Sequence, residues 1–144
     1  MPTTRTASTH WEGTLFEGAG KVTLESSGIG TYEVSFPKRA ADDAGGTTSP
    51  EELIAAAHSS CFSMAFSNGL AKNDTPAASL DTTAAVDFTP GTGITGIKLT
   101  VTGVVPGIDA DAFEAAAQDA KKNCPVSQAL TGTTITLEAS LSEG

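Results

Sequence analysis

The sequence carries little positive charge. Only 8 of its 144 residues are Lys or Arg, against 17 Asp or Glu, and the formal net charge is −9. The basic residues are scattered, with Lys38-Arg39 and Lys121-Lys122 as the adjacent pairs. Nucleic-acid binding needs clustered cations that displace counterions from phosphates, and anionic lipid repels an acidic chain. The sequence therefore predicts neither nucleic acid nor a membrane as a partner.

Long apolar runs are missing as well. The opening residues MPTTRTASTHWEG lack the apolar stretch of a secretory signal, and no run approaches the ~20 residues that cross a bilayer. We therefore expect a cytoplasmic protein. Disulfides in that compartment are transient, catalytic or redox-sensing rather than structural.

Cysteine and aromatic residues are also scarce. Cys61 and Cys124 are the two cysteines, and they belong to no CxxC or zinc-type cluster. Two thiols alone make a poor metal site, so no metal is expected. Aromatic residues make up 6% of the chain, which leaves Ala, Val and Leu to fill most of the core. Such a core favours oligomerisation as a further source of burial.

What is present is a clear order of periodic segments. Alternating apolar and polar residues predict three N-terminal strands at 9–17, 19–26 and 30–36, two strands at 79–89 and 93–105, and a last strand at 133–141. A polar loop of 13 residues, 37–49, follows the first three strands, and loops of this length often carry function. With the helices described next, the order is βββ-α-ββ-α-β. It predicts a single α+β domain over residues 1–144 with mostly antiparallel pairing.

Helix signals surround both cysteines. Ser49 suits an N-cap, Pro50 the first helical position, and Glu52 completes a capping box, so we expect a helix from Pro50 to about Ala71. Its apolar face is predicted to contain Ile54, Ala57, Cys61, Met64 and Ala65. A second helix is expected from residue 109 or 110 to 123. The run PVSQAL then begins a short third helix, with Cys124 as its N-cap.

Pattern alone leaves the role of Cys61 open. Free cysteine is often a small buried hydrophobe, and a thiol in the middle of a helix needs a cation from elsewhere to ionise near neutral pH. Arg39, in the loop before the helix, is a candidate for that cation. Cys124, at the mouth of a short helix, is a possible resolving thiol.

Glu51 is a candidate site residue because Glu52 already has the capping role. Ten residues of helix span about 15 Å, so Glu51 cannot touch Cys61 of its own helix. If both serve one site, the Glu51 near a given Cys61 comes from a second subunit.

His58 lies three residues before Cys61, on nearly the same helical face. Cys61 with His58 therefore suggests an alternative function, a Cys–His hydrolase. A third possibility is a non-enzymatic binding module in which both cysteines are packing residues.

Two long segments carry a resemblance to a known family. SPEELIAAAHSSCFSMAFS, residues 49–67, closely resembles the first cysteine motif of the OsmC/Ohr family, the osmotically inducible protein C and organic hydroperoxide resistance proteins. VVPGIDADAFEAAAQDAKKNCPVSQAL, residues 104–130, resembles the second motif, and the opening HWEGTLFEGAGKVT is also similar. The first motif is more similar to the OsmC branch. The resemblance spans nearly the whole chain and implies an OsmC-like fold, with antiparallel sheets wrapped around a central pair of helices in an intertwined homodimer.

The same resemblance implies an activity and its residues. Cys61 matches the peroxidatic cysteine, Cys124 the resolving cysteine, Glu51 the active-site glutamate, and Arg39 the arginine that stabilises the thiolate. The implied enzyme is a thiol-dependent peroxidase that reduces organic hydroperoxides through a Cys61 sulfenic acid and a Cys61–Cys124 disulfide, in oxidative and osmotic stress defence. A dithiol reductant, a lipoylated protein, is the implied partner, and no cofactor is required.

Overall fold

The computed structural model describes residues 2–142. The chain forms two compact units, Met1–Leu53 and Ile54–Gly144, and the division falls in the first turn of helix α2 (Pro50–Lys72). That the chain acts as a single domain over 1–144 stays a prediction, and residues 1, 143 and 144 lie outside the described part. Within residues 2–142, no helix is both long and apolar enough to cross a membrane.

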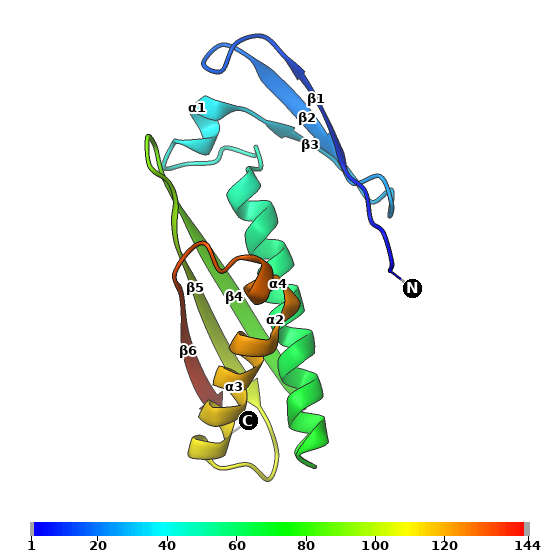
Figure 1. Ribbon diagram of the computed structural model, residues 1–144, viewed down its shortest axis with the longest axis vertical. Helices are drawn as coiled ribbons and strands as arrows, with labels where there is room; N and C mark the ends of the chain where they lie inside the picture. The colour runs from blue at the N-terminus through cyan, green and yellow to red at the C-terminus, as the bar shows by residue number, and fades with distance from the viewer. Residues whose placement is uncertain (1, 143–144) are drawn as a thin grey trace. The chain divides into compact units, whose positions relative to one another are not determined.

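The first unit is built on an antiparallel meander of β1 (Ser8–Glu12), β2 (Ala19–Thr23) and β3 (Thr31–Val34), in that order in the sheet (Figure 1). The predicted meander is confirmed, but its strands are shorter than expected. β1 stops at Glu12 because Gly13 adopts a φ of +93°, which starts a turn closed by a 2.7 Å hydrogen bond from the Gly18 N–H to the Thr14 carbonyl.

The expectation of a plain loop over 37–49 is wrong at its start. Helix α1 (Phe36–Arg39) occupies this segment, and Phe36, assigned to a strand, is its first residue. Ser35 caps the helix, since its hydroxyl accepts from the Lys38 N–H at 3.3 Å, and Pro37 suits the first turn. The short helix places Arg39 in its last turn.

The second unit contains β4 (Ser79–Thr89), β5 (Gly93–Val104) and β6 (Ile135–Ser142), in the order β4-β5-β6. β4 and β5 pair antiparallel as predicted, but β5 and β6 pair in parallel, which departs from the expected antiparallel sheet. Parallel neighbours need a crossover connection. Helices α3 (Ala110–Asn123) and α4 (Pro125–Ala129) provide it, and both were predicted.

Helices α2 and α3 cover one face of this sheet (Figure 1). The core combines side chains of α2, β5, the segment after β5 and α3, with Cys124 at its edge: Phe62, Phe66, Leu70, Leu99, Val101, Val105, Phe113, Ala117, Ala120 and Cys124. Gly103 is required here, because a Cβ at this position would lie 2.7 Å from Cε1 of Phe113.

The predicted apolar face of α2 is wrong in two positions. Phe62, Phe66 and Leu70 point into the core, whereas Ala57 is exposed and the Met64 residue is 72% exposed. The helix carries apolar side chains on more than one side, so its periodicity did not single out the buried face. Cys61 and Ala65 are half-buried at the border of the core, as their spacing indicated.

Candidate active site

The structure brings the two cysteines together. Cys61 is half-buried on α2, and Cys124 is fully buried at the junction of α3 and α4. The Cys61 thiol lies within hydrogen-bonding reach of the Cys124 thiol and of the backbone N–H of Val126. Both thiols are free. Two residues far apart in the sequence thus form one contact in the second unit.

Local sequence explains the position of Cys124. Pro125 disfavours helical geometry in the preceding residue, and Cys124 accordingly has φ −58° and ψ 123°. Its N–H still bonds to the Ala120 carbonyl, so it ends α3 and precedes α4. Val126 lies in the first turn of α4, where backbone N–H groups have no partner within the helix. The N–H of Val126 is thus available to the Cys61 sulfur and favours its thiolate form.

The environment of Cys61 favours the protonated thiol. Burial raises the pKa of Cys61, and the neighbouring Cys124 raises it further, through a hydrogen bond to the thiol and through the repulsion that two adjacent thiolates would feel. The Val126 N–H acts in the opposite direction and lowers the Cys61 pKa. Because the nucleophilic form of cysteine is the thiolate, these contacts leave Cys61 in need of a cation to become reactive.

Arg39 and Glu51 form a two-pronged ion pair in the first unit. Arg39 Nε donates to both carboxylate oxygens of Glu51, at 2.9 and 3.1 Å, and Nη2 donates to Oε1 at 2.7 Å. The Glu51 side chain is only 8% exposed and that of Arg39 is 29% exposed. Such geometry fixes the plane of a guanidinium as well as its position. The family resemblance implied both as site residues, and the structure pairs them.

The predicted capping box is present in one half: Ser49 caps the helix, but the Glu52 carboxylate bonds to Thr48, whereas a capping box would place it on the Ser49 N–H. The Glu52 N–H donates to the Ser49 hydroxyl at 3.1 Å, as expected of an N-cap. The Glu52 carboxylate accepts from the Thr48 hydroxyl at 2.5 Å. Glu52 is therefore engaged at the helix start, while Glu51 is the carboxylate that binds Arg39.

Each unit has a hollow next to its predicted site residue. In the first unit, a hollow of about 360 Å³ lies beside Arg39 and is lined mainly by apolar side chains, among them Trp11, Leu15, Phe36 and Leu53. In the second unit, a hollow of about 660 Å³ lies between α2 and α3, with Cys61, Met64 and Ala65 on its wall. Both sites are therefore open to molecules with an apolar part.

In a Cys–His hydrolase, His58 would hydrogen-bond to the Cys61 thiol, but in this structure it bonds to Ser127. Its ring is fully buried, and Nε2 shares a 2.7 Å hydrogen bond with Oγ of Ser127 on α4. Nδ1 has no partner among the described residues, and burial lowers the pKa of His58. The hydrogen bonds of the Cys61 sulfur go to Cys124 and Val126 instead. Ser127, which follows Cys124 by three residues, was not among the predicted site residues.

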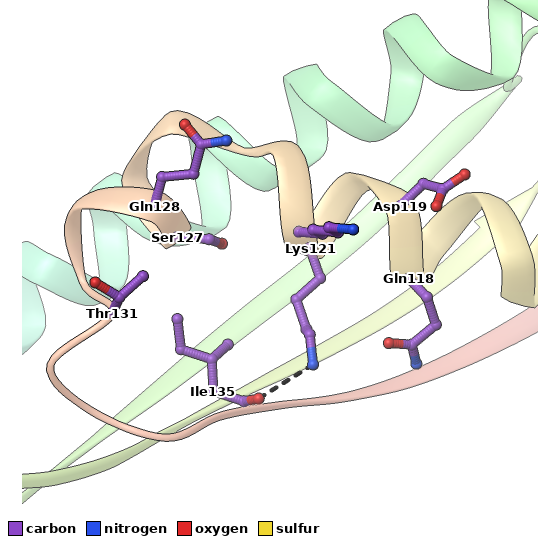
Figure 2. A pocket seen from close by; sticks show the side chains of 8 residues that line it. Gln118, Asp119, Lys121, Ser127, Gln128, Thr131 and Ile135 are labelled. Atoms are coloured by element: carbon purple, nitrogen blue, oxygen red, sulfur yellow. Dashed lines mark hydrogen bonds between the residues drawn. The ribbon is translucent and has the colours of Figure 1, made fainter.

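A third hollow lies on the side of α3 and α4 that faces β6. It measures about 480 Å³ and is lined by Gln118, Asp119, Lys121, Lys122, Ser127, Gln128, Thr131 and Ile135. Figure 2 shows Lys121 reaching from α3 to the carbonyl of Ile135, to which its Nζ donates at 3.2 Å. This contact ties the end of α3 to the first residue of β6. Residues 2–142 bring no three His, Cys, Asp or Glu side chains together as a metal site.

Two free thiols in contact can form a redox-active disulfide. The arrangement of Cys61 and Cys124 therefore suits thiol redox chemistry.

Comparisons with known proteins identify the family. The family model described as "OsmC-like protein" matches residues 42–138. The proteins named Peroxiredoxin OsmC from Escherichia coli strain K12 and from Shigella flexneri are each 44% identical over 124 residues, covering 84% of this chain and 85% of each relative.

Solved structures agree with this assignment. A Legionella pneumophila protein described as an organic hydroperoxide resistance protein OsmC matches with a TM-score of 0.72 and 25% identity, over 96% of this chain and 97% of its own. The chain belongs to the OsmC-like protein family. The resemblance and the α+β fold predicted from the sequence are thereby confirmed.

Proposed function

We propose that this member of the family is a thiol-dependent peroxidase that reduces organic hydroperoxides to alcohols. The contact between the Cys61 and Cys124 thiols carries the proposal, because a peroxidatic and a resolving cysteine must meet to form a disulfide. The names of the relatives, peroxiredoxin and organic hydroperoxide resistance protein, support the same activity. A role in oxidative and osmotic stress defence and a cytoplasmic location follow as predictions.

The proposed reaction has two steps on the protein. The Cys61 thiolate attacks the terminal oxygen of the hydroperoxide, so that an S–O bond forms, the O–O bond breaks, and the alkoxide takes a proton and leaves as the alcohol. The Cys124 thiol then attacks the sulfur of the Cys61 sulfenic acid. An S–S bond forms, the S–O bond breaks, and the hydroxyl leaves as water with the Cys124 proton. An external dithiol, proposed to be that of a lipoylated protein, returns two electrons and two protons.

Arg39 is the proposed source of the cation that Cys61 needs, and Glu51 holds it. α2 runs without interruption from Pro50 to Lys72, and the ten residues from Glu51 to Cys61 correspond to about 15 Å of helix. Because Arg39 is bound to Glu51 of its own chain, we assign the Arg39–Glu51 pair of one subunit to the Cys61 of the other. The proposed enzyme is therefore a homodimer with two shared sites.

Exposed apolar side chains support this homodimer. A sheet needs a partner layer on its apolar face. The meander of the first unit has large apolar side chains exposed on it and its connections: Trp11, Leu15, Phe16, Ile29 and Tyr32. In the second unit, Met64 is exposed on α2. A second copy of the chain would bury these groups.

The choice of an organic substrate rests on the hollows. Apolar side chains line the hollow beside Arg39 and part of the one beside Cys61, and they would receive the alkyl group of a hydroperoxide. Hydrogen peroxide has no alkyl group, so these apolar side chains contribute nothing to its binding. We therefore expect higher kcat/KM for cumene or tert-butyl hydroperoxide than for hydrogen peroxide.

The test is a stoichiometric oxidation of the reduced protein. One equivalent of cumene hydroperoxide should produce an internal Cys61–Cys124 disulfide, observed as a loss of about two mass units and of both titratable thiols. Cys61→Ser should abolish turnover, and Cys124→Ser should form the sulfenic acid once and then stall. Thiols that remain titratable after the dose would disprove the proposal.

A further inference from the structure

Two side-chain contacts join α2 to the segment that runs from the end of α3 into α4. Cys61 contacts Cys124, and His58 contacts Ser127. His58 precedes Cys61 by three residues, and Ser127 follows Cys124 by three. Residues three apart on a helix lie on nearly the same face. His58 and Cys61 therefore lie on nearly the same face of α2, and the thiol pair and the His58–Ser127 pair are neighbouring contacts between that face and residues 124–127.

The His58–Ser127 hydrogen bond is well placed to determine where α4 lies. The helix has only five residues, and Cys124 makes no side-chain capping bond to it. A helix this short has no stability of its own, so its position depends on its tertiary contacts. Ser127 is the buried residue of α4, and its 2.7 Å bond joins it to a fully buried imidazole on α2.

Nothing in the proposed chemistry uses this pair directly. Neither His58 nor Ser127 is among the groups that hydrogen-bond to the Cys61 sulfur. A buried polar pair of this kind could be replaced by apolar groups at little loss of stability. Its presence beside the thiols therefore indicates a purpose other than stability.

We propose that His58 and Ser127 are positioning residues that hold Cys124 against Cys61 for disulfide formation. This inference rests on the proposed function, since it concerns its second step. In that step the Cys124 sulfur must approach the Cys61 sulfur opposite the S–O bond that breaks. The first step, attack on the hydroperoxide, requires Cys61 and a cation but no contact with α4 beyond the Val126 N–H. Loss of the pair therefore slows condensation more than peroxide attack, which it affects only through the Val126 N–H.

A competing reaction makes this difference measurable. The Cys61 sulfenic acid either condenses with Cys124 or meets a second hydroperoxide and becomes a sulfinic acid. Slower condensation raises the fraction that follows the second path at a given hydroperoxide concentration. The ratio of disulfide to sulfinic acid thus reports the geometry of the two thiols rather than the stability of the fold.

Three variants of the pair test the proposal. Ser127→Ala removes the hydroxyl, and His58→Asn shortens the side chain so that its amide overlies Nδ1 rather than Nε2. His58→Gln places an amide near the position of Nε2 and can keep the bond to Ser127. After a rapid mix with tert-butyl hydroperoxide, we expect Ser127→Ala and His58→Asn to condense about tenfold more slowly, the factor that corresponds to one buried hydrogen bond. Their rate of sulfenic acid formation, followed by trapping with dimedone, stays within about twofold of wild type, and His58→Gln recovers most of the condensation rate.

Ser63→Ala is the matched control. Ser63 also lies on α2, and its hydroxyl donates to Thr82 of β4 at 2.7 Å, so the variant loses a similar bond that does not involve α4. It should lose comparable stability and condense at the wild-type rate. Equal condensation in wild type, Ser127→Ala and His58→Asn would overturn the inference, and so would equal slowing by Ser63→Ala. Failure of the wild-type protein itself to form the disulfide would instead overturn the proposed function.

Discussion

The substitution Glu51→Gln tests how much the negative charge of Glu51 contributes to the Arg39–Glu51 pair, because it removes that charge and keeps the size of the side chain. The substitution keeps the length of the side chain and one acceptor oxygen, but it removes the negative charge and turns a second oxygen into a donor. Three hydrogen bonds, at 2.7, 2.9 and 3.1 Å, now depend on that carboxylate. The amide can accept at one position only, and its NH₂ group faces the guanidinium.

The burial of the two side chains determines the expected loss. Breaking a fully buried ion pair costs about 3–5 kcal/mol. Arg39 is 29% exposed, so water replaces part of what the carboxylate provided, and we expect a loss of about 2 kcal/mol in the free energy of unfolding. At a typical urea dependence of about 2 kcal/mol per molar, the unfolding midpoint falls by about 1 M. A guanidinium no longer held in one plane should also lower kcat/KM for cumene hydroperoxide by about a hundredfold.

The assay pairs urea unfolding, at one fixed protein concentration, with peroxidase turnover under a dithiol reductant. Glu52→Gln is the control, because it makes the same change one residue later at an exposed glutamate whose carboxylate binds Thr48. A Glu51→Gln protein within about 0.5 kcal/mol and twofold of wild type would refute the reasoning. A loss of stability without a loss of kcat/KM would remove Glu51 from the site and leave it a structural role.

Three further predictions concern the second unit. Phe66→Ala should lower the free energy of unfolding in urea by about 4 kcal/mol, because the ring is fully buried between those of Phe62 and Phe113. Gly103→Ala should cost about 1–3 kcal/mol in the same assay, because its methyl group would lie 2.7 Å from the Phe113 ring. Burial lowers the pKa of His58, so below its ordinary value of 6.5 the unfolded chain binds a proton that the folded chain does not. Stability should therefore fall as the pH drops from 7 towards 5, and urea midpoints of His58→Gln should show a smaller decline.

Much of the second unit was predictable from local sequence. Both long strands and the helix 110–123 begin or end within a residue of the predicted bounds, since alternation, an Asp109 N-cap and Pro125 mark them. The parallel pairing of β6 with β5 was not predicted, because alternation reports which face of a strand is buried and not the direction of its neighbour.

The residues of the candidate site could be proposed from the sequence, but the contacts of His58 and Ser127 could not. The cysteines, Arg39 and Glu51 could be proposed from spacing, charge and family resemblance. α1 was missed because four residues, two of them Phe and Pro, show no helical period, although Ser35 and Pro37 are capping signals. Ser127 carries no signal by itself, since a serine in a short polar run is usually exposed. Its partner His58 lies 69 residues away, and only the packing of α4 on α2 brings them together.

The parallel crossover from β5 to β6 has a mechanical consequence for the thiols. α3 and α4, with Cys124 between them, form a connection whose two ends continue into neighbouring strands of one sheet. The hydrogen bond from Lys121 to the Ile135 carbonyl holds this connection to β6 at a further point. A segment that is held at both ends in this way cannot move away from the sheet as a rigid body, in contrast to a loop that opens about a hinge. Because the two thiols are already in contact, forming the disulfide requires only a small movement of the backbone around Cys124. Motions of that size take place in nanoseconds to microseconds, so the approach of the thiols is fast compared with the opening and closing of domains.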